Sequence, residues 1–363
     1  MVKVLNITSI KELRGGDMQM LALTEELQKK ESFEGFILTQ KESELSFILQ
    51  NKNITYYESK KSNNFDIRFV RKIISICKKH TISILHAHDS TALNLSLLAS
   101  TFVKNCQIIY SRKSSNRIKD KKLNQWKYNH PKIKAYLCVS DAVKKTLSKT
   151  VIDHSKILTI YDGIPLPKEI PSKIKSTLSQ EFNLSKDTII VGAVGALVKQ
   201  KDLTIFIDVC ALVSKKIKNI VFIIFGKGAL EKELKEYAKA KKLEKNLIFG
   251  GFRTNINELL PQFDSLLITS ITEGLPLTIY EAFYHKIPII TTNAGGIAEV
   301  IQDRKTGMLC NIKDTDCLAS KLIEVLENET LKNTITTHGK DIFNSHFTIE
   351  IMASHYLNFY STL

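Results

Sequence analysis

The chain has 363 residues, of which 43% are apolar, so it is long enough for two core-bearing domains and too long for one ordinary domain. No apolar run reaches the roughly 18 residues of a membrane-spanning helix, and the opening MVKVLNITSI lacks the basic region and cleavage site of a signal peptide, so we expect a cytoplasmic protein. The net charge of +15 is uneven, because residues 1–165 hold 28 lysines and arginines against 15 aspartates and glutamates.

Short apolar segments alternate with helix-like segments along the whole chain. In the first half we predict strands at 2–8, 33–39, 82–88, 106–111 and 135–140 and helices at 17–30, 66–80 and 90–103. In the second half we predict strands at 188–197, 220–226, 246–252, 265–269 and 287–293 and helices at 202–215, 229–242, 255–260 and 277–285. Apolar strands of this kind are typical of parallel sheets that helices cover on both faces. The predicted fold class is therefore α/β, with two doubly wound, Rossmann-like domains.

The segment YDGIPLPKEIP at 161–171 separates the two halves. Three of the seven prolines lie in it, as expected of an interdomain connector. We therefore place one domain at 1–165 and a second at 166–345. Doubly wound domains bind ligands at the carboxyl ends of their strands, so a cleft between the two domains is the expected site.

The segment EGLPLTIYEA at 273–282 carries two carboxylates, Glu273 and Glu281, separated by seven residues. It follows a predicted strand, Gly274 permits a turn, and Pro276 suits the first position of a helix. The amides at such a helix start point toward an anion, which predicts a phosphate site; the amides in question are those of Leu275, Leu277 and Thr278. Carboxylates on either side of the anion can accept hydrogen bonds from hydroxyls, as a sugar nucleotide requires. The alternative is an ordinary loop glutamate and a solvated helix glutamate.

EGLPLTIYEA, together with GGIAEVI at 295–301, resembles the E-x7-E signature of the retaining GT-B glycosyltransferases of family 4. Further matches follow in the family's order over nearly the whole chain. The resemblance implies that Glu273 contacts hydroxyls of the donor sugar, that Glu281 contacts the ribose, and that the amides from Gly274 to Thr278 hold sugar and diphosphate. It also implies that a last helix, at about 346–363, packs back on the first domain, which takes the acceptor.

Two segments of the first domain match the family near its donor site. Gly15 and Gly16 occupy the place of a glycine pair that lets the backbone approach the diphosphate, although flexible loops also contain such pairs. In HAHD at 86–89, His88 matches a histidine near the donor sugar and the acceptor hydroxyl. We interpret His86 as structural, because no further ligands at suitable spacing support a metal site.

The second domain supplies two candidate cations. In VGAVGALVKQKDL at 191–203, Lys201 matches the lysine that contacts the diphosphate of the leaving nucleotide, while Ala196 replaces the family's usual arginine. We interpret Asp202 as a helix cap. Arg253, in GGFR, matches a glycine turn beside the nucleobase, with a surface arginine as the alternative. IFGKG at 224–228 does not form a G-x-G-x-x-G fingerprint, which disfavours a Rossmann dehydrogenase.

We predict no metal site and no cofactor other than the donor, a UDP- or GDP-linked sugar. Asp314 and Asp316 spell D-x-D, but they precede an amphipathic helix at 317–328 and are explained as helix-start residues. The cysteines show no C-x-x-C pair or zinc spacing, so we expect reduced thiols in the cores; they are Cys77, Cys106, Cys138, Cys210, Cys310 and Cys317.

The basic residues gather at 104–134. Ten lie there against one acid, Asp120: Lys104, Arg112, Lys113, Arg117, Lys119, Lys121, Lys122, Lys127, Lys132 and Lys134. Such a patch, with Trp126 inside it, suits an anionic membrane surface on the cytoplasmic side or a phosphate-bearing acceptor, and general solubility is the alternative. No nucleic-acid recognition motif accompanies it.

The predicted function is metal-independent, retaining transfer of a sugar to a glycan or lipid-linked acceptor, in polysaccharide biosynthesis such as that of lipopolysaccharide or capsule. Two alternatives remain. A nucleotide-sugar 2-epimerase of the same fold would need further acid and base carboxylates, which are not evident. An inactive GT-B binding module would have no need of Glu273, Glu281 and Lys201 together.

Overall fold

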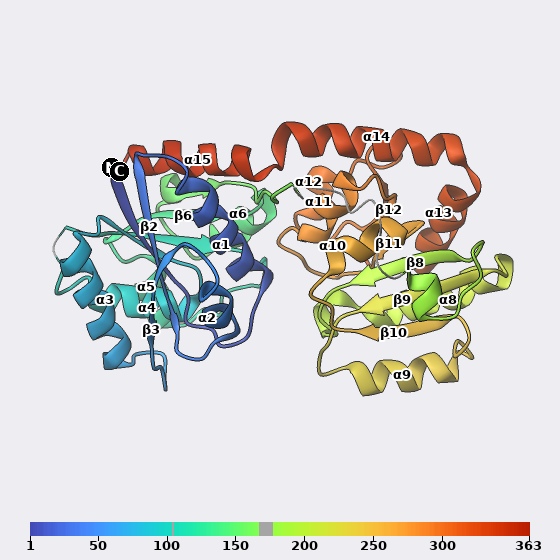
Figure 1. Cartoon of the computed structure of the whole chain (residues 1–363), viewed down its shortest axis with the longest axis horizontal. Helices are drawn as coiled ribbons and strands as arrows, with labels where there is room; N and C mark the ends of the chain where they lie inside the picture. The colour runs from blue at the N-terminus through green and yellow to red at the C-terminus, as the bar shows by residue number, and fades with distance from the viewer. Residues whose placement is uncertain (104, 167–176) are drawn as a thin grey trace. The chain divides into compact units, whose positions relative to one another are not determined.

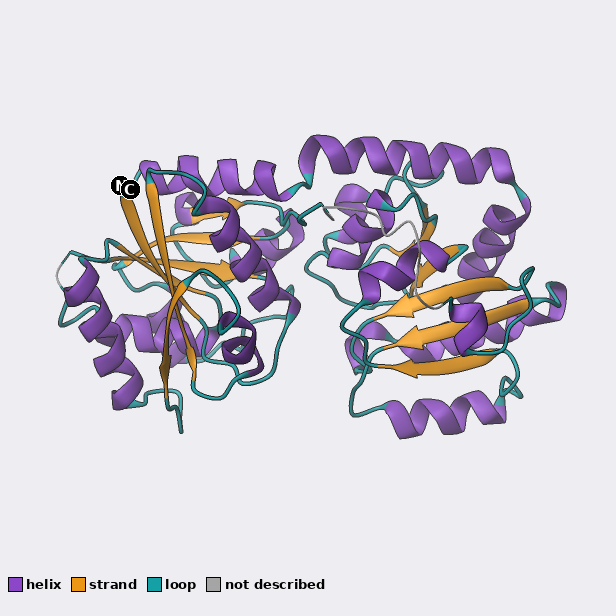
Figure 2. Cartoon of the chain, in the orientation of Figure 1, coloured by secondary structure: helices purple, strands orange, loops and turns teal. Residues whose placement is uncertain are grey.

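The computed structural model describes residues 1–103, 105–166 and 177–363. The chain forms two compact units, one of Met1–Pro165 with Phe347–Leu363 and one of Leu166–His346 (Figure 1). Lys104 of the predicted basic patch, and residues 167–171 of the predicted connector, lie outside the described residues. In each unit the strands are flanked by helices (Figure 2).

The first unit is built on a parallel sheet in the order β3-β2-β1-β4-β5-β6-β7. Its strands are β1 (Val2–Ile7), β2 (Phe33–Gln40), β3 (Thr55–Ser59), β4 (Ile84–Ala87), β5 (Gln107–Arg112), β6 (Ile133–Cys138) and β7 (Ile157–Thr159). Its helices are α1 (Gly15–Leu27), α2 (Glu44–Leu49), α3 (Ile67–His80), α4 (Ser90–Ala99), α5 (Lys122–Tyr128), α6 (Asp141–Leu147) and α15 (Ile349–Ser361), with a 3₁₀ turn at His154–Lys156.

Both faces of this sheet are buried, which explains why its strands are apolar throughout. Leu5 and Leu85 belong to one hydrophobic core, whereas their neighbours Val4 and Ile84 belong to another. Successive side chains of a strand point to opposite faces, so the two cores lie on the two sides of the sheet. Helix α15 packs in the second core, where Tyr356 lies with Val4 and Ile84.

The second unit contains a parallel sheet in the order β10-β9-β8-β11-β12-β13. Its strands are β8 (Ile189–Val194), β9 (Ile220–Phe225), β10 (Leu247–Gly251), β11 (Ser265–Ile268), β12 (Ile289–Thr292) and β13 (Met308–Cys310). Its helices are α7 (Leu178–Glu181), α8 (Leu203–Lys216), α9 (Glu231–Ala240), α10 (Ile256–Leu259), α11 (Leu277–Tyr284), α12 (Ile297–Val300), α13 (Thr315–Glu327) and α14 (Glu329–His346), with 3₁₀ turns at Lys199–Lys201 and Leu260–Gln262. No helix in the described ranges is long and apolar enough to cross a membrane.

The predicted α/β class with two doubly wound sheets is confirmed, and the prediction about the cysteines is wrong for one pair. Cys310 and Cys317 form a disulfide, with their Cα atoms 6.0 Å apart. The turn between β13 and α13 brings them within bridging distance, although their spacing matches no familiar motif. The other four cysteines are free and buried, as expected: Cys77, Cys106, Cys138 and Cys210.

Candidate active site

The order of the strands in the second unit reverses between β8 and β11. The loops that follow these two neighbouring strands run in opposite directions, which opens a crevice at their carboxyl ends, the usual binding place in such sheets. A pocket lies there, lined by Ala193, Val194, Gly195, Ala196, Lys201, Leu203, Ile224, Leu267, Ile268, Thr269, Ser270 and Thr278. The lining thus includes the predicted cation, the alanine that stands in place of the family arginine, and one residue of the EGLPLTIYEA segment.

Helix α11 brings its first turn to this pocket. The helix begins at Leu277, as predicted, and Pro276 is its N-cap, with an extended backbone, rather than its first helical residue. The amide of Ile279 donates to the Pro276 carbonyl at 3.1 Å. The first amides of a helix have no acceptor within it, and Thr278 lines the pocket, so the helix start can offer donors and the positive end of its dipole to an anion. Leu275, just before the cap, is buried.

Lys201 and Glu273, which are 72 residues apart, form an ion pair. The Lys201 Nζ lies 2.6 Å from Glu273 Oε1, and Ser270 Oγ donates to the same oxygen at 2.6 Å. The side chains are 23% and 13% exposed, so the pair is screened from bulk water but reachable. The hydroxyl of Thr269 donates to the Lys201 carbonyl and fixes the turn that carries the lysine. The structure therefore places a cation and a carboxylate together at the mouth of β8 and β11.

Glycines allow the loops of this crevice to pack closely. Gly226 has a φ of +157°, and a Cβ there would lie 1.8 Å from the Gly195 carbonyl oxygen. Gly295 has a φ of +57°, and its Cβ would lie 1.9 Å from the Glu273 carbonyl oxygen. The Gly296 amide also donates to the Gly274 carbonyl at 3.1 Å. The GGIAEVI segment thus holds the backbone of the Glu273 loop in place.

Glu281 lies in α11, where it is partly buried. Burial raises the pKa of its carboxyl from 4.5 to about 7. No hydrogen bond or ion pair to this carboxylate is found among the residues that the structure describes. A pair of hydroxyl donors would favour the charged form and lower this pKa, so the environment suits a ligand that donates hydrogen bonds.

Glu281 should make nucleotide affinity depend on pH. The ionised carboxylate is the better acceptor, so we expect the affinity of the native protein for a nucleoside diphosphate to fall as the pH drops from 8 to 6. Glu281→Ala should bind about 1.5–3 kcal/mol more weakly at pH 8, the usual loss for a charged hydrogen bond, and should show a flatter profile. Calorimetry at several pH values measures both effects. Unchanged affinity in Glu281→Ala would remove this residue from the site.

The same pKa shift has a consequence for stability. The folded-state pKa lies above the unfolded value, so the associated stability is fully present below about pH 4.5 and declines as the pH rises through about 7. Glu281→Gln cannot ionise, so at pH 8 we expect its free energy of unfolding in urea to exceed the native value by about 1–2 kcal/mol, allowing for partial exposure. At pH 4 the two proteins should unfold alike.

Two other predicted residues have structural partners. Arg253 forms an ion pair with Glu181 and donates from Nε to the Gly250 carbonyl at 3.1 Å. It is not among the described residues that line the pocket. Asp202 is the N-cap residue of α8, as interpreted, although its side chain does not make the usual capping hydrogen bond. Its backbone is left-handed, with a φ of +43°, instead of the extended conformation usual for an N-cap residue.

In the first unit, the predicted residues lie at the corresponding reversal, between β1 and β4. Gly15 and Gly16 open α1, and a Cβ on Gly16 would lie 3.4 Å from the Lys113 side chain. His88 follows β4 and is 8% exposed. Its Nε2 is 2.9 Å from Asn6 Oδ1, and its buried Nδ1 has no hydrogen-bond partner among the described residues.

His88 is therefore neutral. Burial lowers its pKa well below the ordinary value, and the nearby cations lower it further. Because Asn6 Oδ1 is an acceptor, Nε2 carries the proton, and Nδ1 keeps a lone pair that a hydroxyl could use. His86 is structural, as we interpreted it: its two ring nitrogens lie 2.7 Å from Tyr360 and Ser111 hydroxyls.

Two residues that contact predicted ones had no role assigned from the sequence. Ser270 holds Glu273, and its position two residues after the end of β11 is a signal for a residue at the strand-end crevice. Asp162 pairs with Lys113 in the first unit, a contact between distant segments that no local pattern predicts.

Helix α13 begins as expected, with Asp314 as its cap: the Asp314 carboxylate accepts from the Cys317 amide at 3.0 Å.

Known proteins resemble this chain over both units. The family model described as Glycosyltransferase Family 4 matches residues 14–167, and the model described as Glycosyl transferases group 1 matches residues 174–341. An Escherichia coli relative, UDP-Gal:alpha-D-GlcNAc-diphosphoundecaprenol alpha-1,3-galactosyltransferase, is 24% identical over 91% of this chain and 89% of its own length. The N-acetyl-alpha-D-glucosaminyl L-malate synthase of Bacillus anthracis is 23% identical over 82% of this chain and 79% of its own.

Solved structures share the fold. Anabaena Alr3699/HepE, in complex with UDP and glucose, superposes with a TM-score of 0.85 at 18% identity over 100% of both chains. A glycosyltransferase from Rickettsia africae gives a TM-score of 0.84 at 20% identity, over 99% of this chain and 98% of its own. The two doubly wound sheets, the reversal-point pocket and the two family models agree: the chain belongs to the GT-B glycosyltransferases of family 4, the glycosyl transferases group 1.

Proposed function

We propose that the protein moves a sugar from a nucleoside diphosphate sugar to a hydroxyl of a glycan or lipid-linked acceptor, with retention of configuration at the anomeric carbon. The observation that carries this proposal is the meeting of Lys201, Glu273 and the start of α11 at the reversal point of the second sheet. A cation and helix-start amides suit a diphosphate, and an adjacent carboxylate suits sugar hydroxyls.

The proposed chemistry places negative charge on the departing diphosphate and positive charge on the sugar ring. Lys201 is then free to leave Glu273 for the diphosphate, where it and the amides of α11 stabilise the growing charge. Glu273 accepts hydrogen bonds from the sugar and stays anionic beside the positive ring. The acceptor hydroxyl attacks from the face that the nucleotide leaves, and the departing phosphate oxygen takes its proton, so no separate protein base is needed. His88 is proposed to orient a hydroxyl through Nδ1.

A panel of nucleotide sugars tests this proposal at the level of the donor. A ligand at 100 times its dissociation constant should add about 2.7 kcal/mol to the stability of the folded protein. We expect UDP- or GDP-linked sugars to protect against thermal unfolding, and the best of them to be consumed when acceptor is added. Protection without sugar transfer to any acceptor would support an inactive binding module instead.

Transfer should not depend on a divalent metal. Lys201 and the helix-start amides supply positive charge where a cation would otherwise act on the diphosphate. We therefore expect the rate to persist in excess EDTA. Loss of activity with EDTA and its return with manganese or magnesium would contradict this mechanism.

We further propose that the acceptor carries phosphate and that the first unit meets it at an anionic membrane surface, in cell-surface polysaccharide biosynthesis. The Escherichia coli relative is named for a diphosphoundecaprenol acceptor, which supports this choice. Helix α5 exposes Leu123 and Trp126, and Lys121 and Lys122 beside them are exposed. Part of the predicted basic patch does not face solvent, because Arg112 and Lys127 are buried. Lys127 Nζ instead donates to Ser90, so the proposal rests on the exposed lysines.

Sedimentation with lipid vesicles tests the membrane contact. Each basic residue near an anionic surface contributes about 1 kcal/mol, and the attraction is screened by salt. We expect binding to anionic vesicles that declines as salt rises and drops when Lys119, Lys121 and Lys122 become Glu. Replacing the exposed Lys232, Lys239 and Lys245 of the second unit with Glu changes the net charge equally and should have less effect. Equal binding to neutral vesicles would contradict the proposal.

A further inference from the structure

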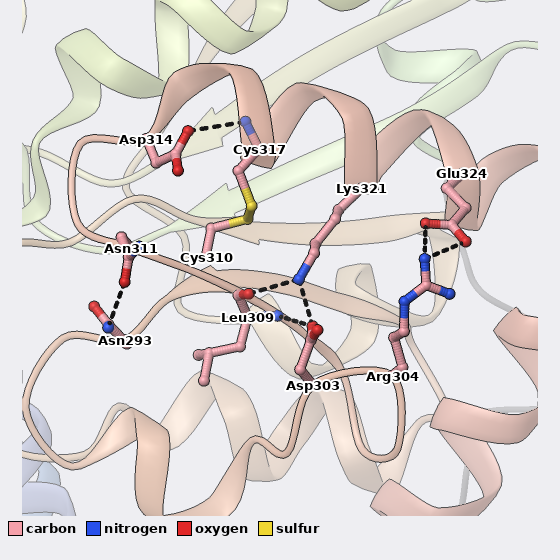
Figure 3. The surroundings of a disulfide bond; sticks show 10 residues. All are labelled: Asn293, Asp303, Arg304, Leu309, Cys310, Asn311, Asp314, Cys317, Lys321 and Glu324. Carbon is pink, nitrogen blue, oxygen red and sulfur yellow. Dashed lines mark hydrogen bonds and ion pairs between the residues drawn. A yellow bond between two sulfur atoms is a disulfide. The ribbon is translucent and has the colours of Figure 1, made fainter.

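The disulfide joins two elements at the edge of the second sheet. Cys310 ends β13 and is 4% exposed, whereas Cys317 lies in the first turn of α13 and is partly exposed (Figure 3). The segment between them consists of a short loop, residues 311–314, and the first two residues of α13, and the bond closes it at both ends. The sulfur of Cys317 is thus the one that a thiol in solution can approach more easily.

One set of contacts leads from this loop to Glu273. The amide of Asn293 donates to the Cys310 carbonyl at 2.8 Å, and its side chain donates to Asn311 Oδ1 at 3.1 Å. Asn293 directly follows β12, and two residues later Gly295 packs on the Glu273 carbonyl. The disulfide therefore anchors the strand end that supports the Glu273 loop.

An electrostatic link also leads from the loop to the turn that carries Lys201. Lys313, within the closed loop, lies near Asp202: burial raises the pKa of the Asp202 carboxyl, and the charge of Lys313 opposes that rise. Lys313 has a left-handed backbone with a φ of +66°, which is unfavourable for a residue with a Cβ. Lys313 lies between the two bonded cysteines, so the bond limits the freedom of the segment that carries this conformation.

We propose that Cys310 and Cys317 form a reversible thiol–disulfide exchange site that sets the affinity of the pocket between β8 and β11 for its nucleotide. The partner is a dithiol of low molecular weight or on another protein. The oxidised state holds the loops after β12 and β13 against the Glu273 and Lys201 turns, and the reduced state releases them. The identity of the ligand as a nucleotide rests on the proposed function.

The exchange conserves electrons and atoms. A thiolate of the dithiol attacks Cys317 Sγ, forming a mixed disulfide, and Cys310 leaves as a thiolate that takes up a proton. The second thiol of the partner then attacks the mixed disulfide and releases Cys317. The partner is oxidised to its disulfide, and the protein gains two thiols. The reverse reaction, with the partner's disulfide, restores the bond.

The proposal is tested by measuring nucleotide affinity in the two states of the bond. Oxidised protein and protein reduced with dithiothreitol are each titrated with UDP and with GDP. Alkylation and mass spectrometry establish the state of each cysteine. Of UDP and GDP, the one that binds should lose at least about fivefold in affinity when the bond is reduced. A change of about fivefold is the lower end of the usual coupling between two sites. The double variant Cys310→Ser with Cys317→Ser should bind like the reduced protein and should not respond to dithiothreitol. Cys106→Ala, which removes a buried free thiol of the first unit, should respond like the native protein.

The outcomes separate this inference from the proposed function. Equal nucleotide affinity in verified oxidised and reduced protein overturns the exchange site and leaves the proposed function standing. The exchange site is also overturned if dithiothreitol does not reduce the bond in the folded protein. It is overturned as well if dithiothreitol lowers the nucleotide affinity of the double variant as much as that of the native protein. Absence of UDP and GDP binding in both states would count against the proposed donor site itself.

Discussion

Lys201→Ala is expected to slow sugar transfer about a hundredfold or more, the scale seen when one donor to a transition-state charge is removed. Lys201 is the cation that lines the pocket beside the start of α11, and Ala196 offers no second charge there. The loss should fall mainly on turnover, because the negative charge of the diphosphate grows in the transition state.

Lys199→Ala is the matched control for this variant. Lys199 belongs to the same 3₁₀ turn and its removal changes the charge equally, but its side chain is exposed and lines no part of the pocket. We expect it to leave the rate nearly unchanged. A fall of less than fivefold in Lys201→Ala would show that another cation holds the phosphates.

Glu273→Gln is expected to lower turnover while leaving nucleotide affinity close to the native value. The glutamine keeps an oxygen for Lys201 and Ser270 but loses the charge that faces the positive sugar ring. A lost charge-assisted interaction costs about 1.5–3 kcal/mol, which corresponds to a tenfold to hundredfold slower reaction. Steady-state kinetics together with calorimetry on the free nucleotide separate the two effects.

The control for this variant is Glu258→Gln, an exposed carboxylate in α10 of the same unit. It should alter neither rate nor affinity. If Glu273→Gln weakened nucleotide binding and left turnover unchanged, Glu273 would belong to the nucleotide rather than to the sugar.

The fold class could be predicted because buried parallel strands are apolar along their whole length. The strand β3 was missed, since TYYES lies at the edge of the sheet, is mixed in polarity and is only partly buried. The short helix α2 was missed as well, because six residues give too little periodicity. Helix α11 was predicted to within one residue at each end, because Gly274 and Pro276 mark its start.

The candidate site was predictable residue by residue but not as a set of contacts. Strand-end position and the family motif pointed to Lys201 and Glu273 separately. Their ion pair depends on β11 lying beside β8, which chain order alone does not reveal, since β9 and β10 intervene in the sequence. The disulfide depends in the same way on the turn from β13 into α13.

The most direct test of the proposed function is proton NMR of the product. The reaction uses the nucleotide sugar that protects the protein best against thermal unfolding, and the spectrum gives the anomeric configuration of the sugar that has been released or transferred. The account predicts that the first product carries the same anomeric configuration as the donor and that its formation is about a hundredfold slower in Lys201→Ala. Inverted configuration would contradict the retaining mechanism. Product formation that Lys201→Ala leaves unchanged would place the reaction elsewhere than in the pocket between β8 and β11.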